Sequence, residues 1–247
     1  MMGAVNGSAG AGGARARARA QFMADLLAVA RERLAAEGPA GLSLRAVARE
    51  LGVASSAVYR YVASRDALLT ALVIEAYEEV GEVCERALAE ALEAGRTPAE
   101  AWLAVGRAFR RYALEHRSSF ELVFGTPVPG YAAPPETVAA AARLWFVIAR
   151  VCAAAAARGE LDPVGPPPVK DLMDPEVLAM AREHLGEEVA LDDALVARAV
   201  TLWVSLVGTT CAEVFGHLRG MTHDHPALFE LTLATAAVGV GLRLPAS

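Results

Sequence analysis

The sequence has few cysteines, no long uninterrupted apolar run and no alternating strand pattern. Its three cysteines, Cys84, Cys152 and Cys211, are odd in number and far apart, which excludes a disulfide framework and does not match the spacing of a zinc site. The longest apolar runs contain Thr, Ser or Arg and fall short of the ~20 residues of a membrane-spanning helix. The N-terminus lacks the apolar core of a signal peptide. We therefore expect a cytoplasmic protein with no membrane partner.

The signatures of catalysis are also missing. His116, His184 and His217 have no nucleophile or carboxylate pattern beside them, and the chain contains no glycine-rich phosphate-binding loop. We expect neither enzymatic activity nor a cofactor. One alternative stays open, because His217, His223 and His225 could supply the ligands of a metal sensor. A short polar loop before a helix has the same appearance.

Alanine and leucine, in contrast, are abundant. Hydrophobic residues make up 55% of the 247 residues, which suffices for a sizeable core. The dominance of Ala and Leu over aromatic residues favours helix throughout, so the expected fold class is all-α. Apart from a short helix that starts at Ser55, helices are expected over 18–36, 43–51, 66–92, 98–116, 118–124, 136–158, 175–185, 191–218 and 226–242.

Charge is distributed unevenly along the chain. Residues 14–65 contain nine arginines, no lysine and four acidic residues, a net charge of +5. The whole chain carries −6, so the remainder carries −11. A basic segment on an acidic chain concentrates the attraction for phosphate at one end.

The first residues are expected to form a disordered arm over 1–17, because glycine, alanine and serine dominate the start without periodicity. Arg15, Arg17 and Arg19 alternate with alanine at the end of this arm. Two interpretations stay open. The arm follows phosphates or the minor groove, or it is a solvated basic leader that adds only loose electrostatic affinity.

The most informative stretch runs from Ser43 to Leu69. Leu44, Val47 and Leu51 recur at helical spacing after Ser43, a candidate N-cap, and Gly52 is placed to end that helix. A second short helix opens at Ser55-Ser56, and because Ala54 offers no capping side chain we expect Ser55 to be its cap. Two short helices joined around a glycine predict a helix-turn-helix, whose second helix suits the major groove.

These residues resemble the TetR family of transcriptional regulators. The resemblance rests on Leu-Ser-Leu-Arg-x-Val-Ala, Leu-Gly-Val and Val-Tyr-x-Tyr-Val-x-Ser-Arg-x-Ala-Leu-Leu, all within residues 42–69. It implies a three-helix DNA-binding head over 18–65, continuous with a larger helical body over 66–247. Residues 118–125 and 145–163, together with Trp203 and Gly208, also resemble a C-terminal domain found in a subset of these regulators.

The resemblance also implies which residues contact DNA. Arg45 matches a position that reads guanine, which suits the fork of an arginine in the major groove. Residues 55–57 match positions that face base edges, and Tyr59, Tyr61, Ser43 and Arg65 match positions that touch backbone phosphate. Tyr61 could instead be a core aromatic, and Arg60 a solvated residue, while Val58 and Val62 are expected in the core. The predicted DNA-binding residues are Ser43, Arg45, Ser55, Ser56, Ala57, Tyr59, Arg60, Tyr61 and Arg65.

In this family the body dimerises and senses a small molecule. The resemblance therefore implies a homodimer, formed through the last two helices, that binds a palindromic operator in double-stranded DNA. The predicted interface stripes, which could instead complete the monomer core, are Leu195, Ala199, Leu202, Leu206 and Thr209, and Leu231, Ala234, Thr235, Val238, Gly241 and Leu242.

The resemblance further implies a repressor that an effector releases from its operator, and we expect this effector to be a small apolar or amphipathic organic molecule. Apolar-lined cavities are the usual sites for such ligands, so it is expected among the aromatic residues of the body. Each of these residues could instead be core. The predicted ligand-binding residues are Trp102, Phe109, Tyr112, Phe120, Phe124, Trp145, Phe146 and Trp203.

Overall fold

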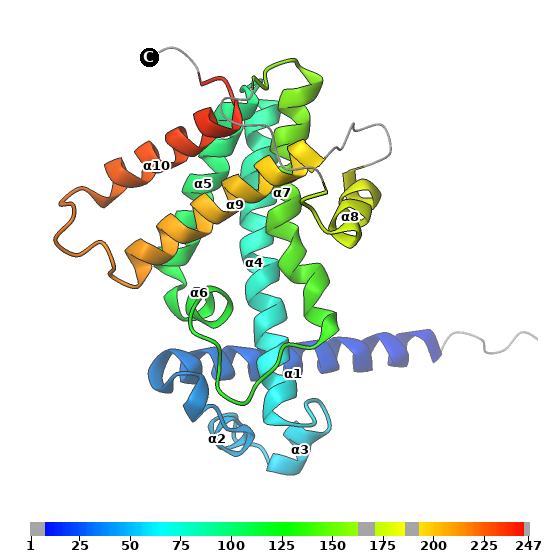
Figure 1. Ribbon diagram of the computed structural model, residues 1–247. Coiled ribbons are helices and arrows are strands. Elements are labelled where there is room, and N and C mark those ends of the chain that lie inside the picture. Colours follow the sequence, from blue (N-terminus) through cyan, green and yellow to red (C-terminus); the bar gives the residue numbers. More distant parts are fainter. Residues whose placement is uncertain (1–7, 163–170, 186–192, 245–247) are drawn as a thin grey trace, which may run out of the picture. The chain divides into compact units, whose positions relative to one another are not determined.

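The computed structural model describes residues 8–162, 171–185 and 193–244 (Figure 1). Within these residues the fold is all-α, as predicted, and an isolated bridge between Leu161 and Leu242 is the one extended pairing. The elements are α1 (Ser8–Glu37), η1 (Pro39–Gly41), α2 (Leu44–Glu50), α3 (Ser55–Tyr59), α4 (Arg65–Glu93), α5 (Pro98–Glu115), α6 (Arg117–Phe124), η2 (Pro135–Thr137), α7 (Val138–Ala157), α8 (Pro175–Leu185), α9 (Asp193–Val214) and α10 (His225–Val240).

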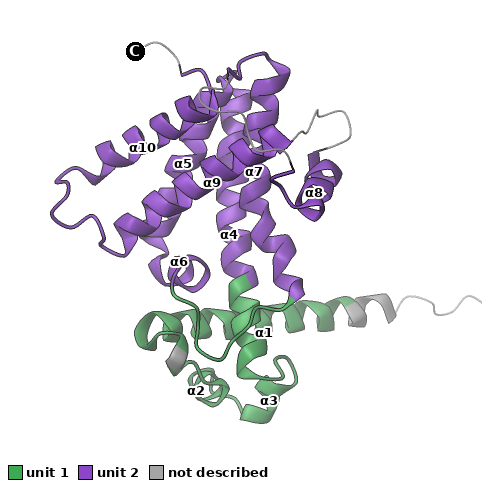
Figure 2. Cartoon of the chain, in the orientation of Figure 1, with its two compact units in different colours: residues 1–73, 126–134 green, residues 74–125, 135–247 purple. Residues whose placement is uncertain are grey.

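The chain divides into two compact units (Figure 2). The head unit comprises residues 1–73 and 126–134, and the body unit comprises residues 74–125 and 135–247. The division falls inside α4, which contributes its first turns to the head unit and the remainder to the body unit. From the sequence we predicted that the head ends at residue 65, and we did not predict that the loop 126–134 belongs to the head unit.

In the head unit, α1 begins ten residues earlier than predicted. Residues 8–17 are helical where the sequence suggested a disordered arm, and residues 1–7 lie outside the described part. Alanine and arginine are both strong helix formers, so their alternation after residue 13 sustains a helix without help from burial. Farther along, Leu26 and Ala30 are fully buried, and α1 packs against α2.

The turn between α2 and α3 depends on Gly52. Its φ is +69°, in the left-handed region, where a side chain would be strained. The amide of Val53 then donates to the carbonyl of Ala48 at 3.0 Å, which closes α2. This turn and the complete burial of Val58 set the start of α3, and Ala54 occupies the N-cap position. The predicted cap at Ser55 was therefore wrong by one residue.

The body unit is built around α5, α7, α9 and α10, which pack on one another. Trp102, Ile148 and Leu206 are among its fully buried side chains. At Gly106, an added Cβ would lie 2.2 Å from Leu233 Cδ1, so glycine permits the close approach of α5 and α10. By length and composition, 135–157 and α9 are apolar enough to cross a membrane, yet both contribute buried side chains to this core.

Candidate functional site

The helix-turn-helix presents a polar surface over a buried apolar base. Val47 and Val58 are fully buried, whereas Arg45, Ser56 and Arg60 are exposed. The structure pairs neither Arg45 nor Arg60 with an acidic side chain among the residues it describes.

The other predicted DNA-binding residues of this segment differ in exposure. Tyr59 is 47% exposed and Ser43 is also exposed, whereas Ser55 and Ala57 are partly exposed. Val58 and Val62 are buried, as predicted.

Arg65 has a structural role that the sequence did not suggest. Its Nη2 donates to the carbonyl of Pro39 at 2.7 Å and its Nε to the carbonyl of Leu42 at 3.3 Å, and Nη1 lies 3.6 Å from Asp66. The side chain thereby links the start of α4 to the turn between α1 and α2. About a third of it stays exposed, so contact with a phosphate remains a prediction.

Tyr61 is held by α1. Its ring centroid lies 4.4 Å from that of Phe22, and the guanidinium carbon of Arg19 lies 5.1 Å from the same Tyr61 centroid. The packing fits the alternative in which Tyr61 is an aromatic between helices. Phosphate contact by its hydroxyl stays a prediction.

The aromatic residues predicted to bind a ligand fall into more than one cluster. Phe109, Phe120 and Phe124 contact one another with ring centroids 4.9–5.7 Å apart. Trp145 contacts Phe146 on α7, and the ring of Phe146 stacks on His184 of α8.

The remaining predicted aromatics are held in the core by other contacts. Trp102 donates a hydrogen bond from Nε1 to the carbonyl of Leu233, and Tyr112 donates one to Glu79. Trp203 is half-buried against the core. Burial of Trp102, Phe109, Phe120, Tyr112 and Phe146 fits the core interpretation.

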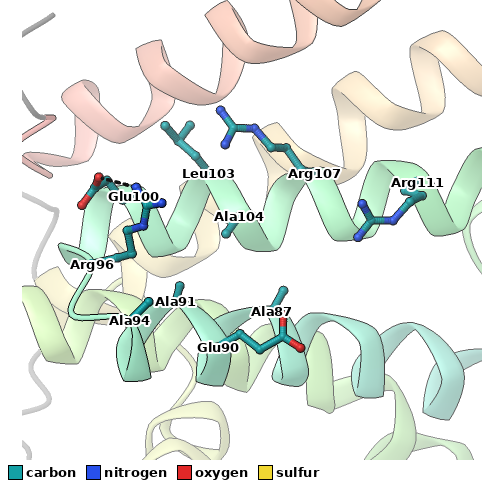
Figure 3. A pocket seen from close by; sticks show the side chains of 10 residues that line it. All are labelled: Ala87, Glu90, Ala91, Ala94, Arg96, Glu100, Leu103, Ala104, Arg107 and Arg111. Carbon is teal, nitrogen blue, oxygen red and sulfur yellow. Dashed lines mark hydrogen bonds and ion pairs between the residues drawn. The ribbon is translucent and has the colours of Figure 1, made fainter.

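An open pocket of about 610 Å³ lies instead between α4 and α5 (Figure 3). Small apolar side chains line it together with charged ones, and none of the eight predicted aromatics does. Arg96 and Glu100 form an ion pair of 3.1 Å on its wall, while Arg111 has no acidic partner among the described residues. A neighbouring pocket of about 270 Å³ includes Tyr112. The larger pocket is lined by Ala87, Glu90, Ala91, Ala94, Arg96, Glu100, Leu103, Ala104, Arg107 and Arg111.

Ion pairs connect the body helices. Arg110 on α5 donates two hydrogen bonds to Glu213 on α9, at 2.7 and 2.6 Å, and these bonds raise the pKa of Arg110. Arg143 on α7 likewise donates twice to Glu85 on α4, and this hydrogen bonding lowers the pKa of Glu85. Both pairs join helices that are distant in sequence, and periodicity alone does not reveal them.

The last two helices present an uncharged outer face. Val204 and Gly208 on α9, and Leu231 and Val238 on α10, are exposed. The hydroxyls of Thr201, Ser205 and Thr235 donate to the carbonyl four residues earlier, which leaves little polar character outside. Several residues of the predicted stripes are buried in the monomer instead: Leu195, Ala199, Leu202, Leu206, Gly241 and Leu242. Gly241 is the left-handed C-cap of α10, with a φ of 94°.

The histidines suggested as metal ligands are not part of a metal-binding cluster. Within the described residues, no three His, Cys, Asp or Glu side chains are grouped so that they could hold a metal ion. Asp224, between His223 and His225, caps α10 by accepting a hydrogen bond from the amide of Ala227 at 2.9 Å. The polar loop thus has a structural explanation.

Family models match two parts of the chain. Residues 26–72 match the model of bacterial regulatory proteins of the tetR family, and residues 102–236 match a tetracyclin repressor-like C-terminal domain. The first match covers the helix-turn-helix, and the second covers most of the body unit.

Comparisons that cover most of the chain agree with these two family matches. An HTH-type transcriptional regulator of Mycobacterium tuberculosis is 37% identical over 211 residues, which are 83% of this chain and 85% of the relative. The crystal structure of the regulatory protein SCO4313 superimposes with a TM-score of 0.67 at 30% identity, over 89% of this chain and 97% of that one. A Rhodococcus protein of unknown function shares the fold, with a TM-score of 0.65 at 24% identity, over 87% and 93% of the two chains.

Proposed function

The chain belongs to the TetR family of transcriptional regulators, and we propose that it is a dimeric repressor released from its operator by a small amphipathic effector. The observation that carries the proposal is the exposed set of Arg45, Ser56, Tyr59 and Arg60 above a buried apolar base. Such a surface fits the major groove, where side chains of α3 and the arginine of α2 reach base edges. Membership of a family of soluble regulators supports a cytoplasmic location.

Selection from a random duplex library tests the DNA-binding part. We expect the purified protein to enrich a palindromic site, because a two-fold dimer reads two half-sites. On that site Arg45→Ala should cost ~1–3 kcal/mol of binding free energy while binding to unrelated DNA stays unchanged. An equal loss on both kinds of DNA would assign Arg45 to the phosphate backbone.

Dimerisation through α9 and α10 is supported by their uncharged outer face. No charged residue occurs between Arg198 and Glu213 or between Glu230 and Arg243. Apart from its chain neighbours and its own helix backbone, no atom of the described chain would lie within 4 Å of a Cβ added at Gly208 or Gly239, so packing of the described residues requires neither glycine. Small residues at such positions let a partner helix approach closely, and an isologous contact of this face with itself gives a closed dimer.

For the effector site we propose the 610 Å³ pocket between α4 and α5 in place of the aromatic cluster (Figure 3). Its alanines and Leu103 offer apolar contact, and Arg111, which has no acidic partner among the described residues, offers hydrogen-bond donors at its edge. Helix α4, which forms one wall, continues into the head unit, where Arg65 at its start bonds to the carbonyls of Pro39 and Leu42. A ligand that displaces α4 would thereby act on the head.

Thermodynamic coupling provides the test. An effector that releases the protein must bind the DNA-free form better, and DNA must weaken effector binding by the same factor, with ~1–3 kcal/mol typical of such switches. We expect Ala104→Phe, which fills the pocket, to abolish the response to amphipathic acids while effector-free operator binding persists. Trp203→Phe serves as the control, because it changes a predicted ligand residue that does not line this pocket. If Trp203→Phe loses the response to the effector and Ala104→Phe retains it, the effector binds among the predicted aromatic residues and not in this pocket.

A metal-responsive mechanism through His217, His223 and His225 receives no support from the structure or the relatives. The family consists of transcription factors, and we expect no catalysis.

A further inference from the structure

The N-terminal part of α1 is a solvent-exposed helix. Every residue from Gly13 to Ala20 is exposed, and none of them is acidic. Nothing in the described chain covers this segment, yet it carries Arg15, Arg17 and Arg19. It is therefore a strongly basic surface with no acidic partner in the described part of the chain.

Helical periodicity places Arg15 and Arg19 on one side of α1 and Arg17 on the other. Positions 15, 19, 22, 26 and 30 lie along one face of a helix, spaced by four, three, four and four residues. On this face Leu26 and Ala30 are buried in the head unit, and Phe22 contacts Tyr61. Arg17 lies about 160° around the helix from both Arg15 and Arg19 at 3.6 residues per turn. We call Arg15 and Arg19 the arginine face.

The arginine face contacts the residue Tyr61 just beyond the end of α3. The guanidinium carbon of Arg19 lies over the ring of Tyr61, 5.1 Å from its centroid, and Tyr61 follows the end of α3 by two residues. The side chain of Arg19 is exposed, so N–H donors of its guanidinium stay available to an acceptor. Arg15 continues the same face one turn farther from Tyr61.

The charge of this face is not neutralised within the described chain. The structure pairs neither Arg15 nor Arg19 with a carboxylate, and Asp25, the first acid along α1, accepts a hydrogen bond from Gln21. Two like charges four residues apart disfavour the helix in isolation. An anion that contacts both would remove that repulsion.

We propose that Arg15 and Arg19 bind backbone phosphates beside the segment of DNA that α3 contacts, as a second contact outside the helix-turn-helix. The inference rests on the proposed DNA binding. It differs from the disordered-arm interpretation in one respect that can be measured. A flexible arm makes all three arginines equivalent, whereas a helix engages Arg15 and Arg19 and leaves Arg17 in solvent.

Salt-dependent titrations test the proposal. The full-length protein is titrated into a fluorescein-labelled random-sequence duplex from about 50 to 200 mM salt, with affinity read by anisotropy. Each lost phosphate contact reduces the slope of log affinity against log salt by about 0.9 for each engaged head. We expect this reduction in Arg15→Ala and in Arg19→Ala, and an unchanged slope in Arg17→Ala, which removes the same charge. Circular dichroism of each variant confirms that the helices are retained.

The outcomes separate the two proposals. If the wild type binds DNA and all three variants show the same slope of log affinity against log salt, whether reduced or unchanged, Arg15 and Arg19 do not form a distinct phosphate-binding face. The proposed DNA-binding function is unaffected by that result. Absence of wild-type binding at the lowest salt overturns both. A lower affinity of Arg19→Ala at an unchanged slope would mean that Arg19 only supports Tyr61, and it would also overturn the phosphate contact.

Discussion

The hydroxyl of Tyr131 lies 3.0 Å from the Oγ1 of Thr70, and this hydrogen bond joins two segments that are 61 residues apart. Thr70 lies on α4 and is buried, and Tyr131 belongs to the loop between α6 and η2. The chain leaves the body unit after Gly125, contacts α4 within the head unit and returns at Pro135. The head unit therefore includes a loop whose flanking residues on both sides belong to the body unit.

Removal of this bond should weaken the head unit. We expect Tyr131→Phe to lower the free energy of unfolding by about 0.5–1.5 kcal/mol, the usual net value of one hydrogen bond. Chemical denaturation of Tyr131→Phe, Thr70→Val and the double variant measures it. If the effects of the two single variants add fully in the double variant, the hydroxyls do not interact in solution.

Arg65→Ala should reduce both stability and DNA affinity. The substitution removes the hydrogen bonds to the carbonyls of Pro39 and Leu42, so thermal unfolding should begin at a lower temperature. If Arg65 also touches phosphate, affinity for all sequences falls about equally and the salt dependence flattens. A variant with wild-type salt dependence but reduced stability would restrict Arg65 to its structural role.

Two ion pairs of α5 provide a matched comparison of burial. In the Arg110–Glu213 pair the side chains are 21% and 11% exposed, and in the Arg107–Glu230 pair 56% and 39%. We expect Arg110→Ala to cost about 1–3 kcal/mol, because Glu213 loses a partner in a poorly solvated position. Arg107→Ala should cost less than about 1 kcal/mol, as exposed pairs do. Equal losses in denaturant titrations would show that burial does not distinguish the pairs.

The dimer face can be tested by burying a charge in it. Leu231 is 63% exposed in the monomer, so Leu231→Glu should leave the fold intact but place an unpaired carboxylate in the proposed interface. We expect sedimentation to show monomers that retain helical circular dichroism and lose operator binding. Leu92→Glu, at an exposed position of α4, is the control and should remain a dimer. An intact dimer for Leu231→Glu would move the interface elsewhere.

The three cysteines should differ in reactivity. Burial raises the pKa of the Cys84 and Cys152 thiols to about 12, so neither forms a thiolate at pH 8. Cys211 is only partly buried, and its pKa is raised by that burial. An aromatic disulfide reagent should therefore modify at most Cys211 in the native protein and all three thiols after denaturation. Rapid native labelling of Cys84 or Cys152 would show that the core opens.

The sequence alone predicted most of the local features. Apolar spacing and turn residues predicted α2, α4, α5, α6, α7, α8 and α10 to within two residues at each end, because a helix with one buried face carries its own period. The run over residues 42–69 indicated the helix-turn-helix and the family, since the turn and its two helices are continuous in sequence. The N-terminal extension of α1 was missed, although the alternation of alanine and arginine was a readable signal.

Only the tertiary structure decided which residues meet across distance. The loop 126–134 belongs to the head unit, Arg65 bonds to carbonyls more than twenty residues away, and Tyr61 lies against α1. Composition could not separate aromatic residues of the core from those of a pocket, because both sites select the same apolar side chains. It also could not distinguish a dimer stripe from a monomer stripe. Packing of the body unit shows which residues of the two stripes are buried within one chain.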